Sequence, residues 1–281
     1  MRRVYQIARI LSLDVVIGAI ASGSLAKYWL GQEMPLIWWL ALPLSVWVIY
    51  TADHLLDAYR LKERASTPRH KFHYRFFKPI LVVWAIALIS CMTWIPFMAP
   101  PELWILGYVM GGIVLVHLGL VYWVGERISW LFTKEFGVGI IYAAGVWGGP
   151  LIFGWGEWPE GTVAVFVQFF LMALINLLFF SLYEREIDEK DGHTSFVRAI
   201  GPRRARGLIG AIAFAVLVIG FGVMGVVENL SLVLLKLQGV YLLMLSLLVM
   251  VSYAEGWFGA GERYRIWGDA VFIFPALIWL I

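Results

Sequence analysis

Long apolar runs dominate the sequence and restrict the chain to one class of fold. We predict nine membrane-spanning segments, each close to the length at which a helix crosses a bilayer. They lie at 10–28, 36–58, 79–98, 103–123, 136–153, 163–183, 208–227, 230–253 and 267–281. Only 15% of residues are charged, against about 25% in soluble domains, and the mean hydropathy is +0.80. We therefore expect an all-α integral membrane protein, a nine-transmembrane-helix bundle that forms one domain over residues 1–281.

The composition also excludes several classes of site. A single cysteine, Cys91, rules out an intrachain disulfide and a cysteine metal cluster. The basic residues lie in short connections between spans and form no nucleic-acid-binding stretch. The first apolar run is longer than a signal-peptide core and has no clear cleavage site, so we expect no cleaved signal peptide.

The distribution of basic residues predicts the topology. Of the 22 lysines and arginines, all except Lys27 and Lys236 fall at the N-terminus or in the even-numbered connections. Because short cytoplasmic loops carry the excess of Lys and Arg, we expect these segments in the cytoplasm and the C-terminus outside. A bacterial inner membrane is the expected location.

Two acidic motifs follow long apolar spans on this cytoplasmic side. Residues 184–191 hold five carboxylates, of which Glu184, Asp188 and Asp191 share one helical face. Asp53 and Asp57 show the same i, i+4 spacing at the end of the second span. A carboxylate after a long apolar span is costly unless it faces a partner or a cavity. The motifs therefore suggest a site for divalent metal and phosphate.

The loops behind these motifs, 59–78 and 184–206, are the longest and the most basic, and we expect them to cap the site. Mg²⁺ takes one or two carboxylates and completes its shell with water and phosphate oxygens, while Arg and Lys bind the remaining phosphate charge. The candidate phosphate-binding residues are Arg60, Arg64, Arg69, Lys71, Lys134 and Lys190.

Each motif also has a simpler interpretation. Asp53 and Asp57 can form a solvated helix end with surface arginines, and such pairs contribute little. Asp14 and Asp269 lie inside terminal spans, where a packing hydrogen bond, an ion pair with a nearby arginine and a role in the site are all open. Lys134 can pair locally with the adjacent glutamate, and Gly107-x-x-x-Gly111 predicts close helix packing.

Together these features resemble the UbiA superfamily of intramembrane prenyltransferases. The first family motif has the form N-D-x-x-D-x-x-x-D; Asp53 and Asp57 fill its last two acidic positions, while Ile49 and Tyr50 stand where Asn and Asp are expected. In the second motif, D-x-x-x-D-x-x-x-D, Glu184 and Asp188 match. Gly192 occupies the third acidic position, one residue after Asp191.

The resemblance implies Mg²⁺ held by Asp53, Asp57, Glu184 and Asp188, bridging these carboxylates to the diphosphate of a prenyl donor. Asp191 then serves as a further ligand or as a base. The implied partners are a prenyl diphosphate, a lipophilic acceptor and the lipid bilayer. The activity is prenyl transfer or, in a UbiA-type terpene cyclase, ring closure of the prenyl chain without an acceptor. Deep aromatic residues such as Tyr142 and Phe169 suit a carbocation, although packing explains them equally well. A transporter or membrane scaffold is the non-enzymatic alternative.

Overall fold

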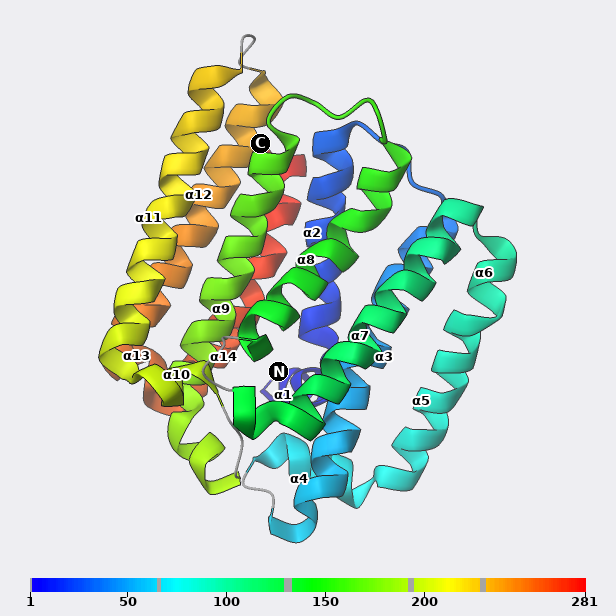
Figure 1. The fold of residues 1–281 in the computed structure, drawn as a ribbon, viewed down its shortest axis with the longest axis vertical. Helices are drawn as coiled ribbons and strands as arrows, with labels where there is room; N and C mark the ends of the chain where they lie inside the picture. The colour runs from blue at the N-terminus through cyan, green and yellow to red at the C-terminus, as the bar shows by residue number, and fades with distance from the viewer. Residues whose placement is uncertain (1, 65–66, 129–132, 192–194, 228–230) are drawn as a thin grey trace.

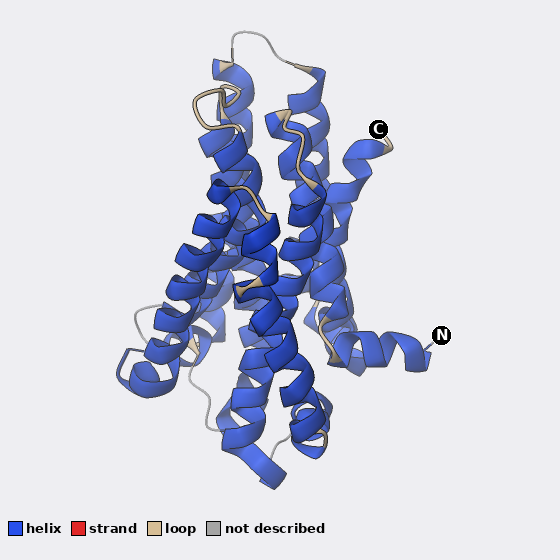
Figure 2. Cartoon of the chain, turned by 90° about the vertical axis from the view of Figure 1, so that its right-hand side faces the viewer, coloured by secondary structure: helices blue, strands red, loops and turns tan. Residues whose placement is uncertain are grey.

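The computed structural model describes residues 2–64, 67–128, 133–191, 195–227 and 231–281, and within them the regular elements are helices (Figure 1, Figure 2). In chain order they are α1 (Arg2–Ile10), α2 (Leu13–Leu30), α3 (Leu36–Leu61), η1 (Lys62–Arg64), α4 (Pro68–Arg75), α5 (Phe77–Met92), α6 (Trp94–Met98), α7 (Pro101–Ile128), α8 (Thr133–Phe153), α9 (Thr162–Asp191), α10 (Phe196–Ile200), α11 (Pro202–Val226), α12 (Leu232–Tyr253), α13 (Glu255–Gly259), η3 (Ala260–Glu262), α14 (Arg263–Ala270) and η4 (Val271–Trp279).

Eight helical stretches in the described part of the chain are long and apolar enough to cross a membrane, which confirms the predicted multi-pass membrane protein. They correspond to the first eight predicted spans. The ninth is divided between the short helix α14 and the 3₁₀ helix η4. At about 1.5 Å per residue in α14 and 2.0 Å in η4, the two together extend roughly 30 Å, about one hydrocarbon thickness. The count of nine crossings stays a prediction.

Helix α9 lies at the centre of the bundle, with α8, α11 and α12 packed against it (Figure 1). In its most apolar stretch 61% of the residues are buried, against 6% for the α5–α6 stretch and 6% for α7. Helices α5, α6 and α7 form an outer layer whose apolar side chains are exposed, as a lipid-facing surface requires. The second acidic motif thus extends from the best-packed helix of the molecule.

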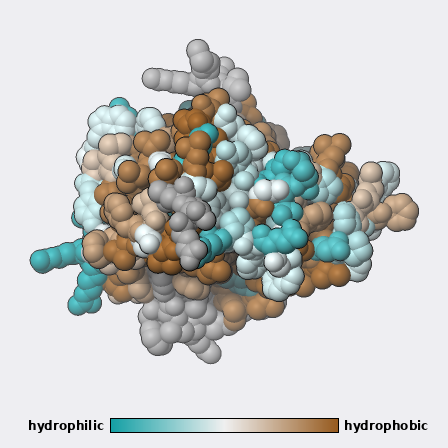
Figure 3. Space-filling view, turned by 90° about the horizontal axis from the view of Figure 1, so that it is seen from above, coloured by the Kyte–Doolittle hydropathy of each residue, from teal (hydrophilic) through white to brown (hydrophobic). Residues whose placement is uncertain are grey.

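The connections between the long helices lie at two opposite ends of the bundle. Helices α1, α4, α10 and α13 gather at one end, and the connections that follow α2, α6 and α8 lie at the other (Figure 1). Figure 3 views this second end, where hydrophilic residues gather between hydrophobic ones that reach the rim. The N-terminus lies near the first end and the C-terminus near the second, as an odd number of crossings requires.

The predicted long loops are largely helical. Helix α3 continues to Leu61 and α9 to Asp191, so both acidic motifs extend their span helices and do not open loops. Inside the first loop, the Thr67-Pro68 sequence starts α4: Thr67 Oγ1 accepts a hydrogen bond of 3.2 Å from the backbone N–H of His70, and Pro68 occupies the first helical turn.

Close helix packing occurs at glycines other than the predicted pair. A Cβ on Gly107 or Gly111 would meet no atom within 4 Å, so the expectation that this pair packs closely against another helix of the chain is wrong. A Cβ on Gly18 of α2 would lie 3.0 Å from Cβ of Phe272 in η4. This glycine allows the C-terminal segment to pack directly along α2.

Candidate functional site

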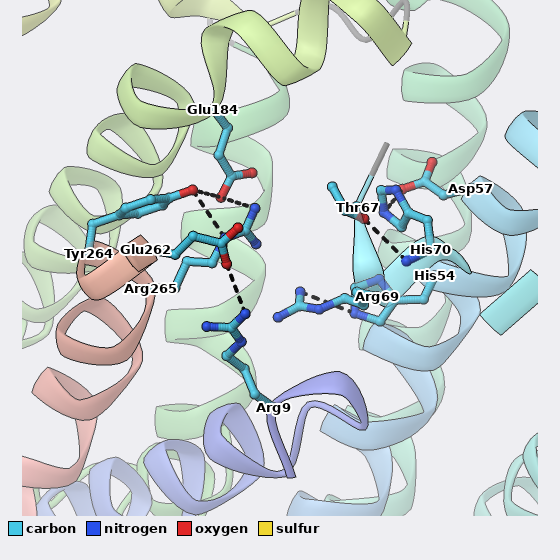
Figure 4. A network of polar contacts seen from close by, with 10 residues as sticks. All are labelled: Arg9, His54, Asp57, Thr67, Arg69, His70, Glu184, Glu262, Tyr264 and Arg265. Carbon is cyan, nitrogen blue, oxygen red and sulfur yellow. Dashed lines mark hydrogen bonds and ion pairs between the residues drawn. The ribbon is translucent and has the colours of Figure 1, made fainter. Parts of the chain in front are cut away.

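The first acidic motif is covered by α4. His70 Nε2 lies 3.4 Å from Oδ2 of Asp57, whose side chain is 13% exposed, and Asp53 is half-buried one turn earlier on α3. Because the Thr67 cap sets where α4 begins, it also sets where His70 meets Asp57 (Figure 4). The carboxylates are therefore partnered and half-buried, unlike a freely solvated helix end.

His54 connects three helices behind this motif. Its Nε2 lies 3.1 Å from Ser12 Oγ, in the turn before α2, and 3.4 Å from Nη1 of Arg69 on α4. An arginine only donates hydrogen bonds, so Nε2 is the acceptor and Nδ1 carries the proton. These contacts hold the guanidinium of Arg69 beside the motif; its charge acts on Asp53.

The second acidic motif is held by the C-terminal segment. Glu184 Oε1 lies 3.0 Å from Nη2 of Arg265 and accepts a longer hydrogen bond, 3.5 Å, from the hydroxyl of Tyr264. Arg265 also faces Glu262, which binds Nη2 of Arg9 at 2.9 Å. Figure 4 shows this group facing the cluster around Asp57. The network joins α9, α14 and the amino-terminal helix at the same end of the bundle.

Burial and the neighbouring negative charges shift the pKa of Arg265 in opposite directions. Burial alone would lower the pKa of this guanidinium, but the carboxylate of Glu184, with smaller contributions from Tyr264 and Glu262, raises the pKa above its ordinary value. The pKa of Tyr264 is raised by burial and further by Glu184, so its hydroxyl stays protonated and able to donate. Arg265 is a permanent cation that fixes the orientation of Glu184.

Lys134, at the start of α8, connects the two motifs electrostatically. Its charge acts on Asp53 and Asp57 of α3, on Asp188 of α9 and on the adjacent Glu135. The neighbouring Glu135 is only 4% exposed and has other partners, because its Oε1 accepts hydrogen bonds from Ser181 Oγ (3.0 Å) and from the backbone N–H of Phe196 (2.9 Å). Glu135 therefore joins α9 and α10 to α8, while Lys134 lies near carboxylates of both acidic motifs.

The predicted site residues thus fall into two groups. Lys134 lies within electrostatic reach of Asp53, Asp57 and Asp188. The charge of Arg69 also acts on Asp53, and that of Glu184 on Asp188. Five candidate phosphate-binding residues are exposed at the same end of the bundle; these are Arg60, Arg64, Lys71, Lys134 and Lys190. Asp191 is the last residue of α9, and its side chain, like Gly192, lies outside the described part.

The carboxylates of the two motifs suit a hard divalent cation whose coordination shell is completed by oxygen atoms of a bound ligand. Within the described ranges no three His, Cys, Asp or Glu side chains converge into a metal site made by protein alone. Mg²⁺ needs only one or two carboxylates when phosphate oxygens and waters complete its octahedron. Asp53 and Asp57 on one side, and Asp188 and Glu184 on the other, meet that requirement.

Comparison with solved structures identifies the fold. No protein-family model and no curated protein matches the sequence. The structure of a UbiA homologue from Aeropyrum pernix K1 superposes with a TM-score of 0.65 over 96% of this chain and 98% of that one, at 16% identity. A UbiA homologue from Archaeoglobus fulgidus, bound to GPP and Mg²⁺, superposes with a TM-score of 0.67 over 98% and 99%, at 10% identity. The chain has the UbiA fold.

This result confirms the predicted resemblance at the level of the fold, along nearly the whole chain. In this UbiA fold the two acidic motifs stand on α3 and α9, at one end of the bundle, as the sequence predicts. The sequence analysis missed Arg265 and Tyr264 as partners of Glu184, and His54 and His70 as partners within the first motif. The position of Arg265, directly before an apolar run, could have marked it as a residue with a partner. That partner, Glu184, lies 81 residues away in sequence, so the sequence did not identify it.

Proposed function

We propose that the chain is a Mg²⁺-dependent intramembrane prenyltransferase of the UbiA superfamily. It ionises a prenyl diphosphate at the cytoplasmic end of the bundle and transfers the prenyl group to a lipophilic acceptor. The observation that carries this proposal is that both acidic motifs extend their span helices, α3 and α9, at the same end of the bundle. Lys134 lies within electrostatic reach of carboxylates of both motifs. The common fold with a UbiA homologue bound to GPP and Mg²⁺ supports it.

The arrangement of charges suits a diphosphate between the motifs. Asp53, Asp57, Glu184 and Asp188 would hold Mg²⁺, which when bound neutralises negative charge on the leaving group. Lys134 and Arg69 supply fixed positive charge beside these carboxylates and bind the remaining phosphate oxygens. Arg265 keeps Glu184 in place. Helix α4, over the first motif, limits access of water to the reacting carbon.

A terpene cyclase is the second candidate, and the aromatic interior favours it. Tyr142 stacks on Phe169 with ring centroids 6.0 Å apart, and Phe272 meets Tyr142 edge-on at 5.3 Å. Aromatic faces stabilise a carbocation, which a cyclase must guide through several bonds. The two candidates differ in one respect: a cyclase releases diphosphate and forms product without any acceptor.

The experiment measures diphosphate release and product formation by purified protein in nanodiscs. Geranyl, farnesyl and geranylgeranyl diphosphate are supplied in turn, with Mg²⁺ or EDTA, and with or without a membrane-lipid extract as acceptor source. A transferase forms product only with extract; a cyclase forms a cyclic product without it. Asp57→Asn is expected to abolish turnover. Glu186→Gln, on an exposed side chain of α9, is the matched control.

Two results would count against the proposal. Full activity of Asp57→Asn in a folded protein would remove the argument for the carboxylate site. Absence of both Mg²⁺-dependent binding and turnover in the unmodified protein would favour the transporter or scaffold.

A further inference from the structure

The corner where α1 meets α2 is bonded towards both acidic motifs. Helix α1 runs across the direction of the long helices, contacts α4 and reaches the start of α14 (Figure 1, Figure 2). At the end of α1, the backbone N–H of Ser12 donates to the backbone oxygen of Arg9 at 3.1 Å. This bond joins two residues whose side chains bind different parts of the site.

Arg9 connects the corner to the second acidic motif. Its Nη2 binds Oε2 of Glu262 at 2.9 Å, and the same oxygen lies 3.6 Å from Nε of Arg265. Arg265 holds Glu184 at 3.0 Å. Positive and negative groups alternate along this line, so each side chain helps to fix the next one, up to a carboxylate of the motif (Figure 4).

Ser12 connects the corner to the first acidic motif. This residue is 1% exposed, and its hydroxyl donates to Nε2 of His54 at 3.1 Å. The same nitrogen lies 3.4 Å from Nη1 of Arg69. His54 directly follows Asp53 on α3, and the charge of Arg69 acts on Asp53. One short segment of the chain is thus bonded towards both motifs.

Two residues of this network have a backbone conformation that side chains rarely adopt. Ser12 has φ 57° and ψ 25°, and Glu262 has φ 55° and ψ 36°, both in the left-handed region. This region is unfavourable for residues other than glycine, because Cβ lies too close to a carbonyl oxygen. Such strain persists only where surrounding contacts enforce it. The bonds of Ser12 to His54 and of Glu262 to Arg9 are contacts of this kind.

The helices that carry the motifs pack mainly on different neighbours. Helix α3 packs against α2, α4 and α5, whereas α9 packs against α8, α11 and α12. Contacts between α2 and α8 join these two groups of helices. At the end that carries the carboxylates, the corner between α1 and α2 adds a link made of hydrogen bonds and ion pairs.

We propose that residues 9–12 form a brace that sets the separation of the two acidic motifs, with Arg9 and Ser12 as positioning residues. The consequence of the brace rests on the proposed function. Mg²⁺ takes few protein carboxylates and completes its shell with phosphate oxygens, so one diphosphate can serve both motifs only when α3 and α9 are held at a fixed spacing. The brace itself contacts neither ligand.

A surface tether for α1 is the simpler interpretation. The side chains of Arg9 and Glu262 are 19% and 40% exposed, and partly exposed ion pairs contribute little to stability. The two interpretations differ in what they predict. Removal of a tether frees α1 and leaves the motifs in place, whereas removal of a brace changes the spacing of the motifs with little change in thermal stability.

The first test measures this spacing without metal or substrate. Nitroxide labels are attached to Tyr59→Cys on α3 and Glu189→Cys on α9, two exposed positions, in a Cys91→Ser background. Double electron–electron resonance in nanodiscs gives the distance distribution. Arg9→Gln removes the cation, and Ser12→Gly removes the hydroxyl while it tolerates the left-handed backbone. We expect either variant to shift or broaden the distribution by about 1–2 Å, the size of a typical helix shift.

Two control variants are matched to these changes. Gln6→Ala removes an exposed polar side chain of α1, and Lys78→Gln removes one exposed cation of α5. Neither should change the distance distribution. Arg9→Lys keeps the cation and should restore most of the unmodified spacing. Thermal unfolding of each variant checks that it is folded.

The second test measures the consequence for the site. Calorimetric titration with an unreactive thiolodiphosphate analogue of the prenyl donor gives its affinity and the Mg²⁺ concentration at half saturation. Outer partners of metal ligands contribute about 10- to 100-fold to metal affinity. The brace acts further out, so we expect half-saturating Mg²⁺ to rise about 3- to 10-fold in Arg9→Gln and in Ser12→Gly. The double variant should be no worse than the more affected single variant, because loss of either bond releases the same brace.

The outcomes for the proposed function and for this inference differ. Failure of the unmodified protein to bind the analogue with Mg²⁺ contradicts the proposed function, while the spacing measurement, which needs no ligand, still tests the brace. Unchanged distance distributions in Arg9→Gln and Ser12→Gly, or an equal change in Gln6→Ala, overturn the brace. Changed spacing with an unchanged Mg²⁺ requirement overturns the positioning role. Effects that multiply in the double variant show two independent contacts and overturn a single brace.

Discussion

Arg265 of α14 holds Glu184 of α9 through a contact of 3.0 Å between Nη2 and Oε1. The Arg265 side chain is 10% exposed and that of Glu184 is 23% exposed, so this ion pair is largely shielded from water. The C-terminal segment therefore orients a carboxylate of the second acidic motif. The same segment contributes Asp269 to the lining of a small cavity inside the bundle.

Replacement of Arg265 tests this relationship. In Arg265→Leu, Glu184 loses its cation and becomes a partly buried, uncompensated charge. We expect the free energy of unfolding to fall by about 1–3 kcal/mol, with lower turnover because Glu184 is no longer oriented. Thermal unfolding in detergent and diphosphate release measure the two effects. Arg263→Leu, which removes an exposed cation stacked on Trp257 at 4.6 Å, is the control. Equal effects of both variants would contradict a special role for Arg265.

Lys134 is expected to determine affinity for the diphosphate. In Lys134→Met the four carboxylates on which this cation acts lose it. A charged hydrogen bond contributes about 1.5–3 kcal/mol, so binding of the thiolodiphosphate analogue should weaken roughly 10- to 150-fold. Calorimetric titration with Mg²⁺ present measures this. Lys78→Met, on an exposed side chain of α5, should change affinity less than threefold. Unchanged affinity in Lys134→Met would contradict a role of this cation in diphosphate binding.

His73 should make stability depend on pH. It is 1% exposed and its Nδ1 donates to the backbone oxygen of Arg69 at 2.9 Å. Burial, with the charges of Arg69 and His70, lowers its pKa below 6.5. The unfolded state then binds more protons than the folded state between the lowered pKa and 6.5, so this contribution to stability is complete above 6.5 and falls as the pH drops towards the folded pKa.

The test compares unfolding curves of the unmodified protein and His73→Asn from pH 7.5 down to 5. Most titratable groups are common to the two proteins, so the difference between the two curves reports on His73 and on its effect on the neighbouring His54. We expect the loss of stability on acidification to be smaller in His73→Asn. Parallel pH dependences would show that His73 does not titrate differently in the two states.

Gly18 should tolerate no side chain. In Gly18→Ala the new Cβ meets Cβ of Phe272 at 3.0 Å, and this atom is fixed to the backbone of η4. The two segments must separate, which we expect to cost about 1–3 kcal/mol. The matched change Gly239→Ala adds a Cβ with no atom within 4 Å and is expected to stabilise its helix by about 0.5–1 kcal/mol. Thermal unfolding of both variants gives the comparison; equal shifts would contradict this packing.

The sequence by itself determined the helical membrane fold, because only spans whose backbone hydrogen bonds are internal are stable in lipid. It also placed Asp53 with Asp57 and Glu184 with Asp188 on shared faces, since i, i+4 spacing on a helix depends on local geometry alone. The one-sided distribution of Lys and Arg likewise placed both motifs at the same end of the bundle.

Contacts between distant helices were decided only by the tertiary structure. Periodicity gives the face of a residue and not the helix that this face meets, so the bonds from Arg265 to Glu184 and from Ser12 to His54 were not predictable. The same applies to Lys134, which the sequence left between a local ion pair and a phosphate contact. Packing sets its surroundings: Glu135 accepts hydrogen bonds from Ser181 and Phe196, and the charge of Lys134 acts on Glu135 and on carboxylates of two other helices. The phosphate contact of Lys134 stays a prediction.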